Sequence, residues 1–142
     1  EDITAHTLTA DDTQVLFKGN RSEEIGSPII TTGNELVGDE IVTFSKGLNI
    51  AGLLRYAGDV RVSTDKLLRD LSFDDTKRRF DDEDRRRVIA SKCVSEDESA
   101  VWLIDYWCGK DVAGIIRMPF TRHLIMHIEA MMRIAKKIGI EI

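Results

Sequence analysis

Two histidines near the C-terminus have the spacing of a metal-binding pair. His123 and His127 are four residues apart in a stretch with helical periodicity, so both imidazoles would lie on the same side of a helix. The pair supplies two of the four ligands that zinc usually takes, which makes both residues metal-ligand candidates. We favour a histidine pair that is either packed within the chain or placed at a subunit contact. At a subunit contact, the pair would make association sensitive to pH near the ordinary histidine pKa of about 6.5.

A carboxylate interrupts the most apolar stretch of the chain. Asp105 lies within residues 100–108, a run of almost only apolar side chains that is typical of a central strand. Because an unpaired buried carboxylate is costly, Asp105 needs either a partner or a wet cleft. The structural interpretation is an ion pair with Arg87, Lys92 or Arg117 from a neighbouring strand. The functional interpretation is a ligand anchor or general base with a raised pKa.

Aromatic and basic residues extend this hypothesis to a ligand site. Trp102 and Tyr106 would line the other face of the strand, either as core beneath a helix or as a stacking platform. Two arginines on neighbouring strands could flank one anion. A cup between sheet and helix would then hold a polar or phosphorylated molecule, with the following candidate binding residues: Asp105, Arg87, Arg117, Trp102 and Tyr106.

No motif in the chain requires a cofactor or fixes a reaction. The sequence contains no phosphate-binding loop, no Gly-x-Ser-x-Gly and no Cys-x-x-Cys. Whether the protein is an enzyme is uncertain, and the pattern favours a protein without catalysis. A small hydrolase that uses Asp105 with His123 and His127 is one alternative to an interaction domain, and a small-ligand binding domain is the other.

Length and charge favour one domain that binds a protein partner. The chain has 142 residues and a net charge of −5, which argues against nucleic acid as a partner. Residues 1–47 hold nine acidic and three basic residues, for a net charge of −6, whereas residues 121–142 hold four basic and two acidic residues, for a net charge of +2. We therefore expect a homo-oligomeric interaction domain that binds a protein through its acidic surface. A small anionic ligand is the alternative partner.

Two further features concern location. No apolar run approaches the roughly 20 residues that a membrane span needs, so we expect no membrane partner. The two cysteines are too few for a disulfide scaffold and favour a reducing, cytoplasmic setting.

The elements expected to position these residues form an α+β fold. Short β-branched or apolar runs bounded by glycine and polar residues predict strands that make a curved, mainly antiparallel sheet. A short helix is expected at 66–71, and the charged stretch 74–87 is expected to be solvated or flexible. The predicted strands span residues 14–18, 29–32, 40–44, 60–62, 88–94, 100–108 and 112–118.

The C-terminal segment predicts a long helix. Five apolar residues recur at spacings of four, three, four and three, which marks one side of an α-helix. Thr121 is the expected N-cap, and Gly139 is the expected left-handed residue at the end. This helix should pack across the sheet through its apolar residues, namely Leu124, Ile128, Met131, Ala135 and Ile138.

Overall fold

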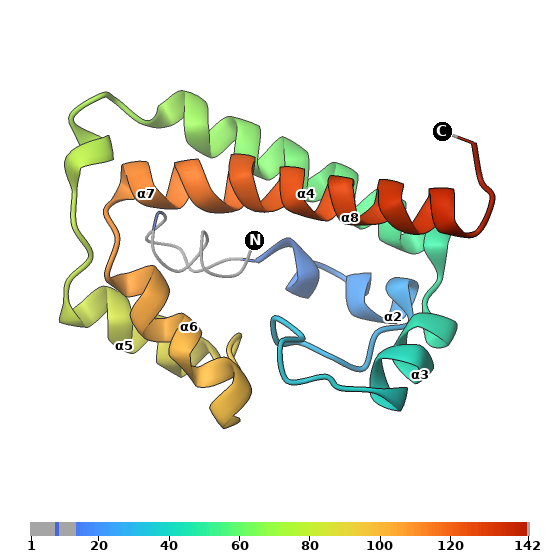
Figure 1. Cartoon of the computed structure of the whole chain (residues 1–142). Coiled ribbons are helices and arrows are strands. Elements are labelled where there is room, and N and C mark those ends of the chain that lie inside the picture. Colours follow the sequence, from blue (N-terminus) through green and yellow to red (C-terminus); the bar gives the residue numbers. More distant parts are fainter. Residues whose placement is uncertain (1–7, 9–13, 142) are drawn as a thin grey trace.

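The protein is helical, and the predicted α+β fold is wrong. A computed structural model describes Leu8 and residues 14–141, and within these residues it contains no β-strand and therefore no sheet. Figure 1 shows the order of the elements along the chain. They are η1 Val15–Phe17, α2 Arg21–Ile25, α3 Asp39–Gly47, α4 Ile50–Asp70, η2 Asp75–Lys77, α5 Asp82–Ser91, α6 Glu98–Cys108, α7 Val112–Arg117, the π-helical turn η3 Met118–His123, and α8 Leu124–Lys137.

None of the predicted strands is present. Residues 40–44 lie in α3 and residues 60–62 in α4, although both segments are rich in β-branched side chains. The predicted short helix 66–71 is the end of the 21-residue helix α4. Residues 14–18 contain the short η1, and residues 29–32 have no regular structure. The β-branched preference for strands is weak, and the helical context overrides it here.

The apolar run 100–108 is a helix rather than a central strand. Its buried side chains are Ala100, Leu103, Ile104 and Trp107, the spacing of one helix face. The exposed side of the helix is also apolar, which hides the helical period in the sequence. Asp97 caps the helix, because its carboxylate accepts a hydrogen bond of 2.8 Å from the backbone N–H of Ser99.

The charged stretch 74–87 contains η2 and the first part of α5. Asp81 and Asp84 form a reciprocal capping box at the start of α5. The carboxylate of Asp84 is buried. It also forms ion pairs with Arg78 at 2.8 Å and with Arg87 at 2.7 Å. The prediction that this stretch is flexible remains untested, but its charges are organised by ion pairs.

The described residues pack into two contact regions. In the first, α5, α6 and α7 enclose a core around Val88, Trp107 and Ile115. In the second, α2 packs against α4 and η1, where Val15, Leu16 and Ile25 are buried. A hydrogen bond of 2.8 Å from the Thr32 N–H to the Cys93 carbonyl joins the loop before α3 to the first region.

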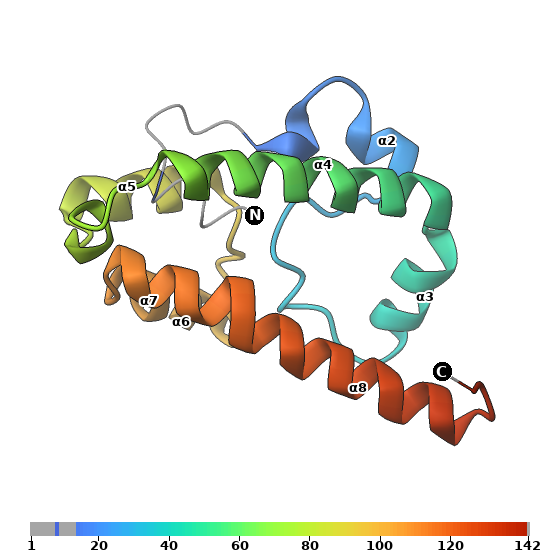
Figure 2. The ribbon, with the colours of Figure 1, turned by 90° about the horizontal axis from the view of Figure 1, so that it is seen from above.

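Helices α7 and α8 form one rod through the π-helical turn η3. Figure 2 shows α8 running on beyond α7, while α4, which overlaps it in Figure 1, diverges from it. The predicted C-terminal helix is present, but there is no sheet among the described residues for it to cover. Thr121 is not its N-cap, because the chain is already helical there and the Thr121 hydroxyl donates to the Arg117 carbonyl.

The end of α8 follows the prediction. Gly139 has a φ of 77°, in the left-handed region that favours glycine. The N–H of Ile140 donates to the Ala135 carbonyl at 2.9 Å, and the N–H of Gly139 donates to the Lys136 carbonyl at 3.3 Å. These two bonds form a Schellman motif, which satisfies carbonyl groups that the helix leaves open.

Candidate protein-interaction surface

The apolar side of α8 is exposed over its whole length. No residue of α8 is buried against any part of the chain that the structure describes. Leu124, Ile125, Met131, Ile134 and Ile138 are each between 53% and 65% exposed. With Ile128, Met132 and Ala135 these residues occupy one broad side of the helix, which we call the α8 apolar face. An apolar area of this extent marks a surface that another molecule covers.

The total exposed area supports this interpretation. The 16.0 kDa chain exposes 9779 Å² of solvent-accessible surface. A compact monomer of the same mass exposes about 7,400 Å², so this chain has an excess of about 2,400 Å². A standard protein–protein interface buries about 800 Å² on each partner. The excess is therefore large enough for a stable interface, or for more than one.

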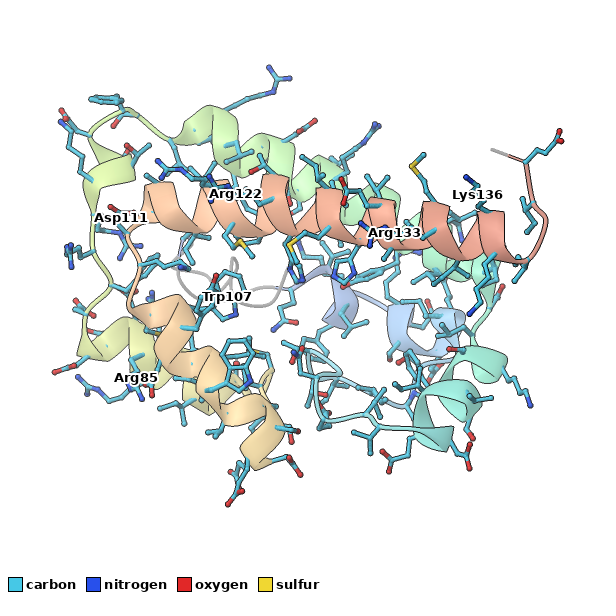
Figure 3. The ribbon with its side chains drawn as sticks, in the orientation of Figure 1. Arg85, Trp107, Asp111, Arg122, Arg133 and Lys136 are labelled. Atoms are coloured by element: carbon cyan, nitrogen blue, oxygen red, sulfur yellow. The ribbon has the colours of Figure 1, made fainter. Side chains whose placement is uncertain are left out.

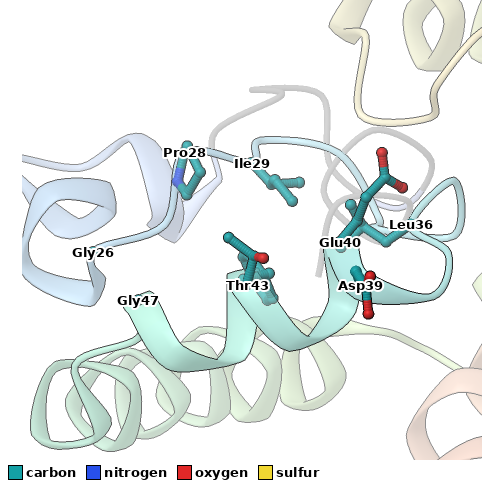
Figure 4. A pocket seen from close by; sticks show the side chains of 9 residues that line it. Gly26, Pro28, Ile29, Leu36, Asp39, Glu40, Thr43 and Gly47 are labelled. Carbon is teal, nitrogen blue, oxygen red and sulfur yellow. The ribbon is translucent and has the colours of Figure 1, made fainter.

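A groove lies between α3 and the loop that precedes it. It has a volume of about 580 Å³, which is within the range of ordinary binding pockets. Figure 4 shows side chains of the loop facing those of α3 across this space. We call it the α3 groove, and it is lined by Gly26, Pro28, Ile29, Leu36, Asp39, Glu40, Thr43, Phe44 and Gly47.

Two carboxylates belong to the wall of the α3 groove. Asp39 and Glu40 form the first turn of α3 and are exposed. Glu40 accepts a hydrogen bond of 3.1 Å from the Val37 N–H, and within the described residues neither carboxylate is in an ion pair. The groove therefore combines apolar walls with uncompensated negative charge, which suits an apolar side chain next to a basic one.

The histidine pair lies at the beginning of α8 and its rings touch. The two Nε2 atoms of His123 and His127 are 2.9 Å apart, and the ring centroids are 4.4 Å apart. Partial burial lowers the pKa of His123, and the neighbouring His127 lowers it further. Within residue 8 and residues 14–141, no group of three or more side chains could hold a metal ion. Metal binding by this pair stays a prediction, because the two histidines are the two ligands that the hypothesis can name.

Asp105 lies on the exposed side of α6 and not inside a strand. Its carboxylate forms an ion pair with Arg85 at 2.5 Å, and its side chain is 75% exposed. The sequence predicted a partner for this residue, but not this one, because Arg85 comes within reach only when α5 and α6 are helices. The solvent that surrounds the carboxylate removes the cost of burial on which the functional interpretation was based.

The other candidate ligand residues are divided between different partners. Arg87 binds the buried Asp84, whereas Arg117 is exposed on α7. Trp102 and Tyr106 do lie together on α6, with ring centroids 5.6 Å apart. Figure 3 shows Arg85 beside α6, while Arg133 and Lys136 extend from the far part of the rod. Asp105 and Arg87 therefore form ion pairs with different residues, Arg85 and Asp84 respectively.

Cys108 is a poor nucleophile in this position. Burial raises the pKa of its thiol, an effect that Arg85 only partly opposes. A raised pKa leaves less of the reactive thiolate at neutral pH. The surroundings of this cysteine therefore disfavour covalent chemistry.

The α3 groove was not predicted from the sequence. Residues 40–44 were interpreted as a strand, so Asp39 and Glu40 were counted only as general acidic charge. The signal that could have revealed the helix is the position of these two acids, directly after Gly38 and before Ile41 and Phe44. Acidic residues are favoured in the first turn of a helix because they face its positive end.

Comparison with known proteins does not indicate a function, so the function has to be argued from the two surfaces described above. No known family model matches the chain, and no curated protein or solved structure is significantly similar to it. Among the described residues, no helix has both the length and the apolar character that crossing a bilayer requires.

Proposed function

We propose that this protein is a non-enzymatic interaction domain that self-associates. The observation that carries the proposal is the α8 apolar face, which no described residue buries. Most of the stability of a helix in a protein comes from packing of its apolar side, and α8, although it continues the rod that α7 anchors, has no buried residue of its own. A second molecule of the same chain supplies that packing without any further component.

The composition of the groove and of α8 supports protein binding over catalysis. The two pairs of side chains singled out for chemistry are an exposed salt bridge, Asp105–Arg85, and a histidine pair without a third ligand among the described residues. The acidic surface that we expect to bind a partner includes Asp39 and Glu40 at the α3 groove. The chain has two cysteines, too few for a disulfide scaffold, and we propose a cytoplasmic location on this basis.

Sedimentation velocity over a range of concentrations tests self-association. We expect a particle of at least twice the 16.0 kDa mass of one chain. The substitution Met131→Glu places a charge in the α8 apolar face and should shift the protein towards monomer. Met126→Glu is the matched control, because Met126 is equally exposed on the basic side of the same helix. A wild-type protein that stays monomeric at all concentrations would remove the proposal.

A further inference from the structure

We infer that the α3 groove of one molecule receives the C-terminal part of α8 from a second molecule of the same chain. This head-to-tail contact rests on the proposed self-association and adds which two surfaces meet. It joins residues 133–140 of one copy to the first turn of α3 and the loop 26–36 of the next.

The α3 groove has defined requirements for its occupant. Its walls are formed mainly by apolar side chains, including Ile29, Leu36 and Phe44, around a volume of about 580 Å³. Asp39 and Glu40 contribute negative charge that no described residue neutralises by an ion pair. The best occupant is therefore a pair of aliphatic side chains that carries positive charge beside it.

The end of α8 has these properties. Ile134 and Ile138 are one helical turn apart, so they project from the same side, and both are at least 60% exposed. Lys137 follows Ile134 by three residues and therefore borders this pair. Neither Lys136 nor Lys137 is in an ion pair with any described residue. The positive charge is thus available to a partner.

The charge distribution of the whole chain points the same way. Residues 1–47 have a net charge of −6 and residues 121–142 a net charge of +2, counted as nine acids against three bases and four bases against two acids. Two copies approaching head to tail bring opposite charges together, which speeds association and disfavours other orientations. Two copies that met groove to groove would instead bring their acidic surfaces together.

The occupant comes from a second molecule because the chain's own α8 does not fill the groove. No residue of α8 lines it. The rod that ends in α8 is fixed at its other end, where Val112 and Ile115 of α7 are buried in the core. A symmetric pair of α8 helices would cover the α8 apolar face but would leave the α3 groove empty. The head-to-tail contact fills the α3 groove and covers the C-terminal end of the α8 apolar face.

A head-to-tail contact has a consequence for the size of the assembly. Each added molecule leaves one free groove and one free α8 at the ends, so the assembly closes into a ring or continues as an open chain. A symmetric pair would stop at two copies. Species larger than a dimer are therefore expected as the concentration rises.

Charge reversal on each side tests the contact. The groove variant carries Asp39→Lys and Glu40→Lys, and the helix variant carries Lys136→Glu and Lys137→Glu. Each variant alone should self-associate at least about tenfold more weakly than the wild type, by sedimentation velocity. An equimolar mixture should recover the large species, because each reversed surface then meets a complementary one on the other variant.

A matched control keeps the result specific. Asp82→Lys with Glu83→Lys makes the same change in net charge in the first turn of α5, away from the groove. It should associate as the wild type does, and circular dichroism checks that every variant keeps its helix content. Wild-type protein that forms no oligomer overturns the self-association itself. Oligomers that the groove variant forms as readily as the wild type, or two weakened variants that do not recover when mixed, overturn the head-to-tail contact alone.

Discussion

Gly52 in α4 lies directly against the backbone carbonyl of Glu24 in α2, closer than any side chain at this position allows. A Cβ atom built on Gly52 would overlap the oxygen and the carbon of that carbonyl. Gly52 is also the one buried residue of α4 within the described chain. The packing of α2 on α4 therefore depends on a missing side chain.

Replacing this glycine should loosen the contact. We expect Gly52→Ala to lower the free energy of unfolding by about 1–3 kcal/mol, because α2 has to move away from α4. Gly58→Ala is the control in the same helix, since a Cβ atom there meets nothing within 4 Å. It should instead raise the stability by about 0.4–1 kcal/mol. Urea unfolding followed by circular dichroism measures both, and equal effects of the two substitutions would contradict the proposed close approach.

The buried carboxylate of Asp84 should be a major determinant of stability. It accepts hydrogen bonds from Arg78, from Arg87 and from the backbone N–H of Asp81. We expect Asp84→Ala to cost about 2–3 kcal/mol, because it removes the carboxylate that both arginines bind and half of the capping box. Asp82→Ala, at an exposed position in the same turn, should cost less than about 1 kcal/mol. Chemical unfolding of both variants would show the prediction wrong if their stabilities are equal.

The cap of α6 should lose its contribution in acid. Hydrogen bonds from the Ser99 hydroxyl and backbone N–H hold the pKa of Asp97 below its usual value of 3.8. A lowered pKa in the folded state stabilises the protein above pH 3.8, and this contribution is lost as the pH falls through the lowered pKa. An asparagine side chain would cap the helix without titrating, so Asp97→Asn should have a lower melting temperature than the wild type at pH 7. The difference should shrink at pH 2.5, and a constant difference would contradict the assignment.

His123 should make the protein less stable in mild acid. Its pKa is lowered from 6.5, first by burial and then by His127, so the folded state binds a proton less readily than the unfolded state. The resulting loss of stability begins as the pH falls below 6.5 and reaches its limit below the lowered pKa. His123→Gln should therefore lose less stability than the wild type between pH 7.5 and pH 5. Parallel thermal unfolding at the two pH values measures this, and identical losses would refute it.

Local signals in the sequence identified the C-terminal helix but not the rest of the fold. The five-residue apolar stripe and Gly139 were sufficient for α8, because amphipathic periodicity and a left-handed glycine are both visible in the sequence. The run 100–108 was misread because its exposed side, with Val101 and Trp102, is as apolar as its buried side. Periodicity disappears when both sides of a helix carry the same kind of residue.

The two candidate interaction surfaces, the α8 apolar face and the α3 groove, were harder to predict than the helix α8 itself. The predicted apolar side of α8 is present. What it binds depends on the elements around it, and a sheet was expected to cover it. The α3 groove depends on Gly26 and Gly47, whose backbones approach closely, and on a loop with no repeating pattern. Contacts between loops and helices that are distant in sequence leave no periodic signal, so they appear only in three dimensions.

The π-helical turn at residues 118–123 decides where the apolar side chains of α8 point. Such a turn contains one residue more than the α-helical geometry needs. If the same residues, Met118–His123, wound as a regular α-helix, everything after them would be rotated by about 100° relative to α7. The same isoleucines would then face another direction, with no change in their identity. Orientation is encoded here by the winding of one turn, so a change that made this turn regular α-helix at the same chain length would redirect the surface while leaving its composition intact.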